Sequence, residues 1–423
     1  MFHSAKDRSW TVLFSLIFAG EMIFSLPFHV PRYFRPTFLE SFNLTNADLG
    51  DSFAIYGLTA MICYFPGGLI ADLFSARRLL TASLVATALG GIYLAQIPTG
   101  AGLYIVFGYW GITTILMFWS GMIKATRDWG GNTTQGRAFG LLDGGRGLVA
   151  ALMSTIAVLI FARILGTGSE MNQKQSIQAV IYFYSAITAL AALFIWRYIP
   201  ETKVQPSVRV HPFKGMTQVM TSSRIWLQAG IIICAYCAYK GLDNYGLYAV
   251  QVLSMDQIEA ATFTSIAAYL RPVGAVAAGI LADRFKASKV ILWNFIILTV
   301  LFGSLSIRWS EALLFNLAMF NLLISYLAVF ALRGVYFALV EESKVHPNIT
   351  GTAVGFISLV GFTPDVFFGA VSGRILDANV GLKGFENYFL FLMLLAMVGL
   401  IAAFILSKMN ASLEKNQRAE NSS

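Results

Sequence analysis

The sequence predicts an all-α polytopic membrane protein with twelve transmembrane helices in two pseudo-symmetric six-helix bundles. Three observations predict this class. Of the 423 residues 57% are apolar and only 12% are charged, whereas about a quarter of a soluble domain is charged. The apolar residues form runs long enough to cross a bilayer, which takes about 20 residues, and one half of the chain repeats motifs of the other. A soluble multidomain enzyme, a disordered chain and a disulfide scaffold are therefore excluded.

Twelve apolar runs are long enough to be spans, and they fall into two groups of six. The first group covers approximately 10–38, 47–73, 79–97, 102–124, 138–165 and 177–197. The second group covers approximately 224–250, 258–282, 289–307, 312–338, 352–376 and 386–407. Continuous runs exclude a β-barrel, whose short strands alternate. No small-residue cleavage site follows the first run, so we expect it to remain as a span.

Lysine and arginine predict the orientation, because they are concentrated in cytoplasmic loops. With the N-terminus inside, 20 of the 30 lie on the cytoplasmic side and seven on the opposite side. Both termini and the central linker are therefore expected in the cytoplasm. The basic residues are dispersed among loops, which argues against nucleic-acid binding. Short loops and termini favour a bacterial inner membrane.

An internal repeat divides the chain. The stretch Gly68–Arg78 recurs as Gly279–Lys289, an offset of 211 residues. We expect an N-terminal bundle over 1–199, a proline-containing cytoplasmic linker over 200–223, a C-terminal bundle over 224–408 and a cytoplasmic tail over 409–423. Two six-span halves joined by such a linker predict an alternating-access carrier with its site between the halves.

The repeated stretch resembles the loop motif of the major facilitator superfamily, Gly-x-x-x-Asp-x-x-x-x-Arg/Lys-Arg/Lys. The resemblance implies a secondary transporter with a conformational latch at the cytoplasmic ends of the spans. The latch residues are Gly68, Asp72, Arg77, Arg78, Gly279, Asp283, Arg284 and Lys289. The glycines are expected to permit close helix approach, and the aspartates to accept hydrogen bonds from a neighbouring helix end.

A weaker resemblance concerns the organophosphate:phosphate antiporter branch. That branch carries one arginine on span 1 and one on span 7, and the corresponding places here fall on His29 and at or beside Lys240. Both departures weaken direct phosphate recognition. The stretch 140–147 on span 5 lacks the proline of the drug:proton exchangers, which disfavours a multidrug exporter.

Span 1 carries polar residues on one helical face. Glu21, Ser25, His29 and Arg32 follow one another at steps of four, four and three. A carboxylate within the membrane needs a reason, because its insertion costs about 2.5–3.5 kcal/mol. We interpret Glu21 as a proton-coupling group and His29, an imidazole that titrates near neutral pH, as a substrate contact. In the alternative interpretation Glu21 pairs with a neighbouring cation structurally and Arg32 extends to the outer interface.

Spans 7, 8 and 11 also carry charges at membrane depth. Tyr236, Lys240 and Asp243 share a face of span 7, and the superfamily resemblance implies that span 7 lines the cavity, so all three are candidate substrate-binding residues. Arg271 is a candidate anion anchor, because guanidinium suits a carboxylate or phosphate through two parallel bonds. Asp365 is a candidate proton site. The alternative is a structural Arg271–Asp365 pair.

Other charges have simpler interpretations. Asp143 and Arg146 lie three residues apart on span 5 and are expected to pair structurally. Lys124, Arg127 and Asp128 end span 4 and are interpreted as gate or interface charges rather than substrate ligands.

The sequence thus predicts a transporter of a small polar organic solute, anionic or zwitterionic, coupled to protons. Exchange of a phosphorylated metabolite for phosphate is the alternative, and a membrane solute sensor without net flux is a hypothesis of a different class. No enzyme motif, cofactor site or metal site is expected, and Cys234 and Cys237 are interpreted as core residues. The expected partners are the solute, protons and the lipid bilayer, and the expected state is a monomer.

Overall fold

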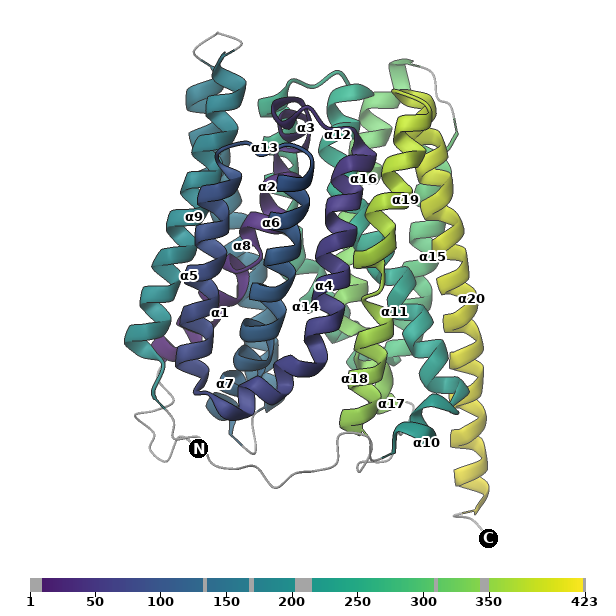
Figure 1. The fold of residues 1–423 in the computed structure, drawn as a ribbon. Helices are drawn as coiled ribbons and strands as arrows, with labels where there is room; N and C mark the ends of the chain where they lie inside the picture. The colour runs from purple at the N-terminus through teal and green to yellow at the C-terminus, as the bar shows by residue number, and fades with distance from the viewer. Residues whose placement is uncertain are drawn as a thin grey trace. The chain divides into compact units, whose positions relative to one another are not determined.

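The computed structural model describes residues 10–131, 135–166, 171–201, 215–307, 311–342 and 350–420, and the regular elements in these ranges are helices (Figure 1). Each predicted span corresponds to one helix or to consecutive helices, so the all-α class is confirmed. Residues 202–214 of the expected linker lie outside the described residues.

The first six spans contain two stretches of π-helix, labelled η1 and η2, in addition to α-helices. The elements are α1 (Trp10–Met22), η1 (Ser25–His29), α2 (Val30–Tyr33), α3 (Arg35–Phe42), α4 (Asn46–Leu73), α5 (Ala76–Leu94), α6 (Ala101–Gly111), η2 (Ile112–Trp119), α7 (Ser120–Gly130), α8 (Gln135–Leu165) and α9 (Met171–Tyr198). Local signals set the helix starts. Thr45 and Asp48 form a capping box at α4, and the Ser75 hydroxyl caps α5.

The second half is interrupted more often. Its elements are α10 (Met216–Met220), α11 (Ser223–Gly241), η3 (Leu242–Asn244), α12 (Tyr245–Gln251), α13 (Gln257–Ala267), α14 (Leu270–Phe285), α15 (Ala287–Leu305), α16 (Glu311–Val335), α17 (Ala338–Glu342), α18 (Thr350–Gly361), α19 (Pro364–Ala378) and α20 (Leu382–Glu420). Pro364 separates α18 from α19, because proline cannot donate the backbone hydrogen bond that a continuous helix needs.

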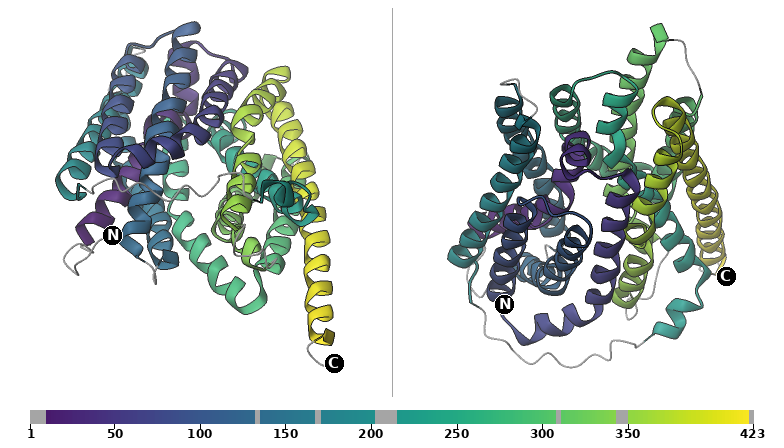
Figure 2. Two further views of the ribbon diagram at one scale, coloured as in Figure 1. Left: turned by 60° about the horizontal axis from the view of Figure 1, so that its bottom comes forward. Right: turned by 45° about the horizontal axis from the view of Figure 1, so that its top comes forward.

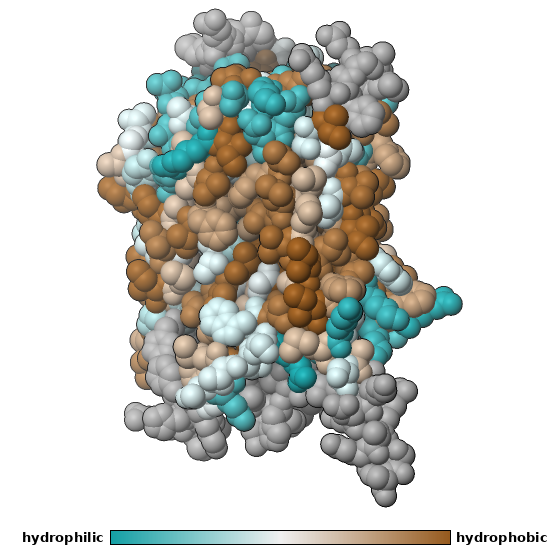
Figure 3. All heavy atoms as spheres, turned by 90° about the vertical axis from the view of Figure 1, so that its right-hand side faces the viewer, coloured by the Kyte–Doolittle hydropathy of each residue, from teal (hydrophilic) through white to brown (hydrophobic). Residues whose placement is uncertain are grey.

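Membrane-spanning character follows from length and apolarity. Among the described residues, nine helical segments are long and apolar enough to cross a membrane, and a tenth is the bent pair Trp10–Met22 and Ser25–Tyr33. The two other predicted spans are α4 and α5, helices of 28 and 19 residues. Apolar side chains cover the middle of the face in Figure 3, and α20 exposes Leu394, Val398 and Ile401. Such exposure is tolerated where the solvent is lipid.

The chain forms two compact units. Unit 1 contains Met1–Ser207, Asp243–Tyr269 and Asp365–Asp377, and unit 2 contains Val208–Leu242, Leu270–Pro364 and Ala378–Ser423. Unit 1 thus joins two short segments of the second half to the first six spans. The division into sequence halves at the linker stays a prediction.

In unit 1, α1 packs against α7, α8 and α9. Two glycines permit this approach. A Cβ on Gly145 of α8 would lie 2.7 Å from the Ile17 side chain, and a Cβ on Gly20 of α1 would lie 3.3 Å from Cδ of Arg146. Gly20 therefore leaves room for the Arg146 side chain beside α1.

Also in unit 1, α4 and α19 lie side by side (Figure 2), and glycines bring their backbones into contact. A Cβ on Gly50 would lie 2.2 Å from the carbonyl oxygen of Gly369, and one on Gly373 would lie 2.4 Å from that of Asn46. Small residues allow this approach, and van der Waals contact then replaces the hydrophobic effect, which does not drive association within lipid.

Polar contacts hold the same two helices together. Arg374 donates two hydrogen bonds to the Asp51 carboxylate, at 2.8 and 3.0 Å. Asp377 accepts from the backbone N–H groups of Asn46 and Ala47, at 3.2 and 2.7 Å. These N–H groups begin α4 and have no partner within the helix, so a carboxylate of α19 completes the hydrogen bonding of the α4 N-terminus.

We expect Gly50→Ala to lower the apparent melting temperature of the purified protein. The added methyl group would collide with a backbone oxygen, and overpacking costs about 1–3 kcal/mol, more than the roughly 1 kcal/mol that alanine gains over glycine inside a helix. Gly68→Ala on the same helix is the matched control, because a Cβ there meets no described atom within 4 Å. It should leave the melting temperature unchanged or raise it. Equal melting curves for both variants would contradict the close contact.

Candidate functional site

The site begins at a break in the first span. α1 ends at Met22, η1 holds Ser25–His29, and the two helical parts meet at an angle of 41°. Pro27 lies within η1 and has no N–H to donate. Stretches of π-helix inside α-helical spans occur frequently at functional sites, and here the break lies between Glu21 and His29.

Hydroxyl groups compensate the backbone at this break. The carbonyl oxygen of Met22 accepts hydrogen bonds from the Ser25 hydroxyl at 2.6 Å and from the Thr188 hydroxyl of α9 at 3.1 Å. In a membrane, irregular backbone is tolerated only where its polar groups find such partners. Thr188 therefore supports the bent shape of span 1.

Glu21 is the centre of a buried charge cluster in unit 1. Its Oε1 lies 3.2 Å from Nε2 of His29, and its Oε2 accepts a hydrogen bond of 3.1 Å from Nε of Arg146. The side chains of Glu21 and His29 are 3% and 4% exposed. A buried carboxylate needs a partner of opposite charge, and Arg146 supplies it from α8.

Further contacts position the Arg146 guanidinium. It lies over the Phe24 ring at 5.7 Å, and its Nη1 is 3.8 Å from Asp143, whose side chain is 50% exposed. The predicted Asp143–Arg146 pair is therefore present but long, and the shorter contact of Arg146 is with Glu21. Two carboxylates and one aromatic ring therefore surround the guanidinium.

The structure places another predicted site residue in an ion pair. Asp243, predicted to contact substrate, accepts a hydrogen bond from Nε of Arg32, the residue expected to extend to the outer interface. Both side chains are buried in unit 1. Asp243 is thus held by a cation of span 1, a contact that the sequence reasoning did not predict.

The remaining predicted substrate residues lie in unit 2. Lys240 is 3% exposed at the end of α11. The Tyr236 ring stacks on Tyr239 at 5.8 Å, and the Arg333 guanidinium lies 3.8 Å over Tyr239. Arg333 thus joins an aromatic cluster, a contact that the sequence analysis does not predict. Its cation is stabilised by the negative faces of the rings.

Arg271 and Asp365 each lie in the first turn of a helix. Arg271 precedes Pro272 in α14, and Asp365 follows Pro364 in α19. A carboxylate in a first turn is stabilised by the helix dipole. Arg271 belongs to unit 2 and Asp365 to unit 1, so the anion anchor and the structural pair both stay predictions.

The expected latch glycines do not make the close helix contact that was predicted for them. A Cβ on Gly68 or on Gly279 would meet no described atom within 4 Å, so close helix approach does not explain either glycine in this structure. Gly50 and Gly373 serve that purpose instead. The side chain of Asp72 lies outside the described residues.

The basic latch residues of the first repeat have defined contacts. Arg78 pairs with Glu201 at 2.7 Å, and Arg77 lies 3.9 Å from the same carboxylate and 4.2 Å over the Trp196 ring. In the second repeat, Asp283, Arg284 and Lys289 are exposed. Whether these residues act as a latch stays a prediction.

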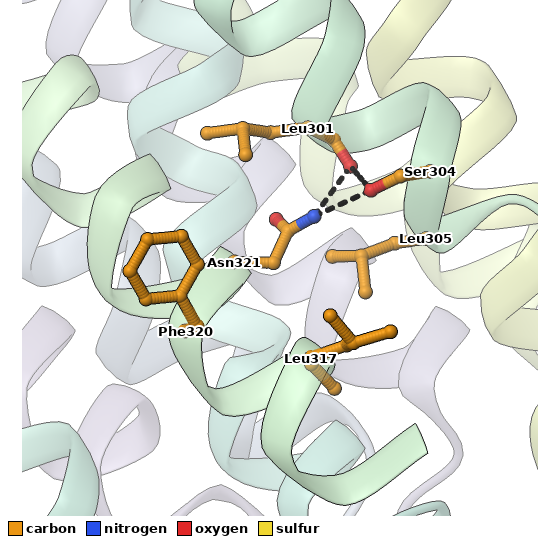
Figure 4. A pocket seen from close by; sticks show the side chains of 7 residues that line it. Leu301, Ser304, Leu305, Leu317, Phe320 and Asn321 are labelled. Carbon is orange, nitrogen blue, oxygen red and sulfur yellow. Dashed lines mark hydrogen bonds between the residues drawn. The ribbon is translucent and has the colours of Figure 1, made fainter. Parts of the chain in front are cut away.

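Two cavities contrast in their chemistry. One has a volume of about 460 Å³ in unit 1 and is lined by Gly68, Ala71, Trp119, Ser120, Ile123, Lys124, Arg127 and Asp128. The other, in unit 2, has a volume of about 220 Å³ and is lined mostly by apolar residues of α15 and α16 (Figure 4). There the Asn321 amide donates to the Leu301 carbonyl and to the Ser304 hydroxyl, at 2.9 and 2.6 Å. The charged residues thus line the first cavity.

Charged groups buried inside a polytopic helical protein mark a functional site, and comparison with known proteins gives its class. A sequence model of the Major Facilitator Superfamily matches residues 12–367. This chain belongs to the Major Facilitator Superfamily, whose fold has twelve spans in two six-helix domains.

Individual relatives extend over most of the chain. "Inner membrane protein YihN" of Escherichia coli (strain K12) is 28% identical over 421 residues, which cover 97% of this chain and 98% of YihN. "Probable nitrate/nitrite antiporter NarK1" of Thermus thermophilus is 23% identical, covering 72% and 67%. A solved bacterial homologue of the human lysosomal transporter Spinster, in an inward-facing and occupied conformation, has a TM-score of 0.73 at 14% identity, covering 96% and 98%. It shares the fold.

Sequence reasoning selected Glu21 and His29 but missed their partner. Arg146 is 125 residues from Glu21, and its neighbour Asp143 offered a nearer carboxylate. The sequence did contain one signal. On span 1 the basic residue nearest to Glu21 is His29, eight residues away, so a cation from another span was needed to balance the carboxylate.

We expect Arg146→Gln to destabilise the protein strongly. It leaves Glu21 buried without its guanidinium, and breaking a buried pair costs about 3–5 kcal/mol. Combining it with Glu21→Gln should restore much of the melting temperature, since no unpaired charge then remains. Lys383→Gln is the control, because the lysine is exposed, its partner Glu386 lies only three residues away, and such pairs contribute little. A double variant no more stable than Arg146→Gln would show that the pair is not the cause.

Proposed function

We propose that this protein is a secondary active transporter that moves a small polar organic solute, anionic or zwitterionic, by alternating access coupled to protons. The observation that carries this proposal is the buried carboxylate of Glu21 held between Arg146 and His29. We further propose that it resides in a bacterial inner membrane with both termini in the cytoplasm, in line with the lysine and arginine distribution and with its inner-membrane relative.

The cluster suggests how a proton and an anion are coupled. When Glu21 is ionised, it occupies the Arg146 guanidinium. When Glu21 takes up a proton, it loses its charge and its attraction for Arg146. The guanidinium then needs another anion, because a buried charge without a partner is costly. In this mechanism a proton on Glu21 and a solute anion on Arg146 stabilise the same state, which favours joint movement of the two.

His29 can interact with Glu21 or with the solute in either of its protonation states. As an imidazolium it can hold the ionised Glu21, and as a neutral imidazole it can accept or donate one hydrogen bond. The proposal assigns it to the solute, together with Lys240, Arg271 and Tyr236 from the sequence prediction. Asp243 pairs with Arg32, and we propose that it contacts solute only when that pair opens.

Two further considerations bear on the solute. A relative with 23% identity is named a probable nitrate/nitrite antiporter, which supports an anionic group. Exchange of a phosphorylated metabolite for phosphate stays the second hypothesis. The two hypotheses differ in what drives uptake. Proton-coupled transport needs a proton gradient, whereas exchange for phosphate does not.

We expect Glu21→Gln to abolish proton-driven accumulation and to retain exchange of internal for external solute, because glutamine can neither bind nor release the proton. The measurement is uptake of a labelled solute into vesicles with and without an imposed pH gradient. A solute is first selected by its thermal stabilisation of the wild-type protein. Asp143→Asn is the control, since that carboxylate is half exposed and 3.8 Å from Arg146. Full accumulation by Glu21→Gln at normal expression would exclude proton coupling at this residue.

We expect Arg271→Lys to lose most solute affinity while it folds normally, because a point charge cannot reproduce two parallel guanidinium hydrogen bonds. The structural alternative gives the opposite result: Arg271→Lys lowers the melting temperature, and Asp365→Asn restores it. Solute binding and melting temperature are measured for both single variants and the double variant. Normal affinity and stability in the double variant would make Arg271 a structural residue.

A further inference from the structure

The cavity between α4 and α7 in unit 1 is lined by two basic side chains. Its volume of about 460 Å³ lies within the range of about 300–1,000 Å³ that is typical of small-molecule sites. Among the described residues that line it, Lys124 and Arg127 carry positive charge and Asp128 carries a carboxylate. Within the described part of the chain, no carboxylate lies at ion-pair distance from either cation.

Both cations have N–H donors that can bind a further acceptor. The Lys124 ammonium group donates one hydrogen bond, of 2.6 Å, to the carbonyl oxygen of Ala71. This contact fixes the ammonium at the wall of the cavity and leaves two of its three donors. Arg127 is exposed on the next turn of α7 and can present its planar guanidinium to two oxygens at once. An oxyanion would satisfy both groups.

The absence of a side chain at Gly68 contributes to the volume of the cavity. A Cβ on Gly68 would meet no described atom within 4 Å, and Gly68 itself lines the cavity. Its missing side chain therefore leaves open volume opposite Lys124. This explains a motif glycine that helix packing does not explain.

The cavity is also connected to the charge cluster by aromatic contacts. Trp119 lines the cavity and ends the π-helix η2. Its ring lies 6.3 Å from that of Phe24, and the Arg146 guanidinium lies 5.7 Å from the centre of the Phe24 ring. Two rings thus link the cavity to the group that holds Glu21.

We propose that this cavity binds an oxyanion group, such as phosphate, sulfate, nitrate or carboxylate, through Lys124 and Arg127, with Trp119 against the apolar part of the ligand. The inference rests on the proposed function in one respect. We take the bound oxyanion to be the anionic group of the transported solute, before the solute reaches Arg146. An anionic lipid headgroup has the same chemistry, and the experiment separates the two sources.

The test is saturable thermal stabilisation of the full-length protein in detergent by inorganic phosphate, sulfate and nitrate at constant ionic strength. Phosphate and sulfate stabilise most proteins nonspecifically, so the readout is the difference between wild type and variants. Lys124→Gln with Arg127→Gln should raise the apparent Kd at least about tenfold, because each removes a charge-assisted hydrogen bond. Asp128→Asn should lower it, since a repelling charge is removed.

A second variant keeps both charges. Gly68→Leu fills the cavity, and we expect it to weaken anion binding to a similar extent. Arg197→Gln is the matched control, because Arg197 is an exposed cation of unit 1 that does not line the cavity, and its Kd should stay within about twofold of wild type. Equal Kd values for wild type, the charge variant, Gly68→Leu and the control would overturn the proposal.

The ligand source is identified by repeating the measurement in nanodiscs with and without phosphatidylglycerol. Stabilisation by soluble anions that is lost in the variants supports a solute site. Stabilisation only by the anionic lipid, lost in the same variants, supports the oxyanion site with a headgroup as its ligand. Solute flux into vesicles tests transport separately. If the cavity variants leave solute flux unchanged, the cavity has no role in transport, and the proposed transport function stands. If anions bind but no proton-driven flux occurs, the proposed function is rejected, and the binding site stands.

Discussion

The Glu21 carboxylate constrains the rest of unit 1, because a charge at 3% exposure has to be neutralised from nearby. Three features follow from this requirement. Arg146 approaches from α8, Gly20 and Gly145 let α8 come close enough, and the break in span 1 brings His29 to the same carboxylate. The hydroxyl groups of Ser25 and Thr188 then compensate the backbone at the break. Each feature costs stability taken alone, and together they hold an ionisable group at membrane depth.

Both π-helical stretches of the described chain lie beside charged groups. η1 ends on His29, and η2 ends on Trp119, one turn before Lys124. A π-helix weakens the regular backbone ladder, and such stretches persist mainly where function requires them. In the proposed function, an anion moves from the Lys124 and Arg127 cavity to the Arg146 guanidinium past Trp119 and Phe24.

The sequence was sufficient for the fold because lipid imposes a simple rule: about 20 apolar residues must form one helix. It also identified Glu21, since a carboxylate within such a run stands out. It could not identify Arg146 as the partner, because pairing between spans depends on helix rotation and on glycine contacts that no local pattern encodes. The same limit applies to Arg32 and Asp243, which are 211 residues apart. The π-helices were missed because they result from backbone compensation, not from residue periodicity.

The glycines of α4 also show that a sequence motif does not identify the residues at a helix contact. Gly50 and Gly68 lie on one helix, and the recurring motif contains Gly68. Gly50 contacts the α19 backbone, whereas Gly68 borders open volume. In a membrane, helix association depends on such van der Waals contacts rather than on hydrophobic burial, so a glycine contact can be made and broken with little change in solvation. A carrier that alternates between states needs contacts of this kind. The α4–α19 contact, completed by Asp377 at the α4 N-terminus, is one contact that the proposed alternating access could open, and the same proposal assigns the exchange of anions to the Glu21–Arg146 pair.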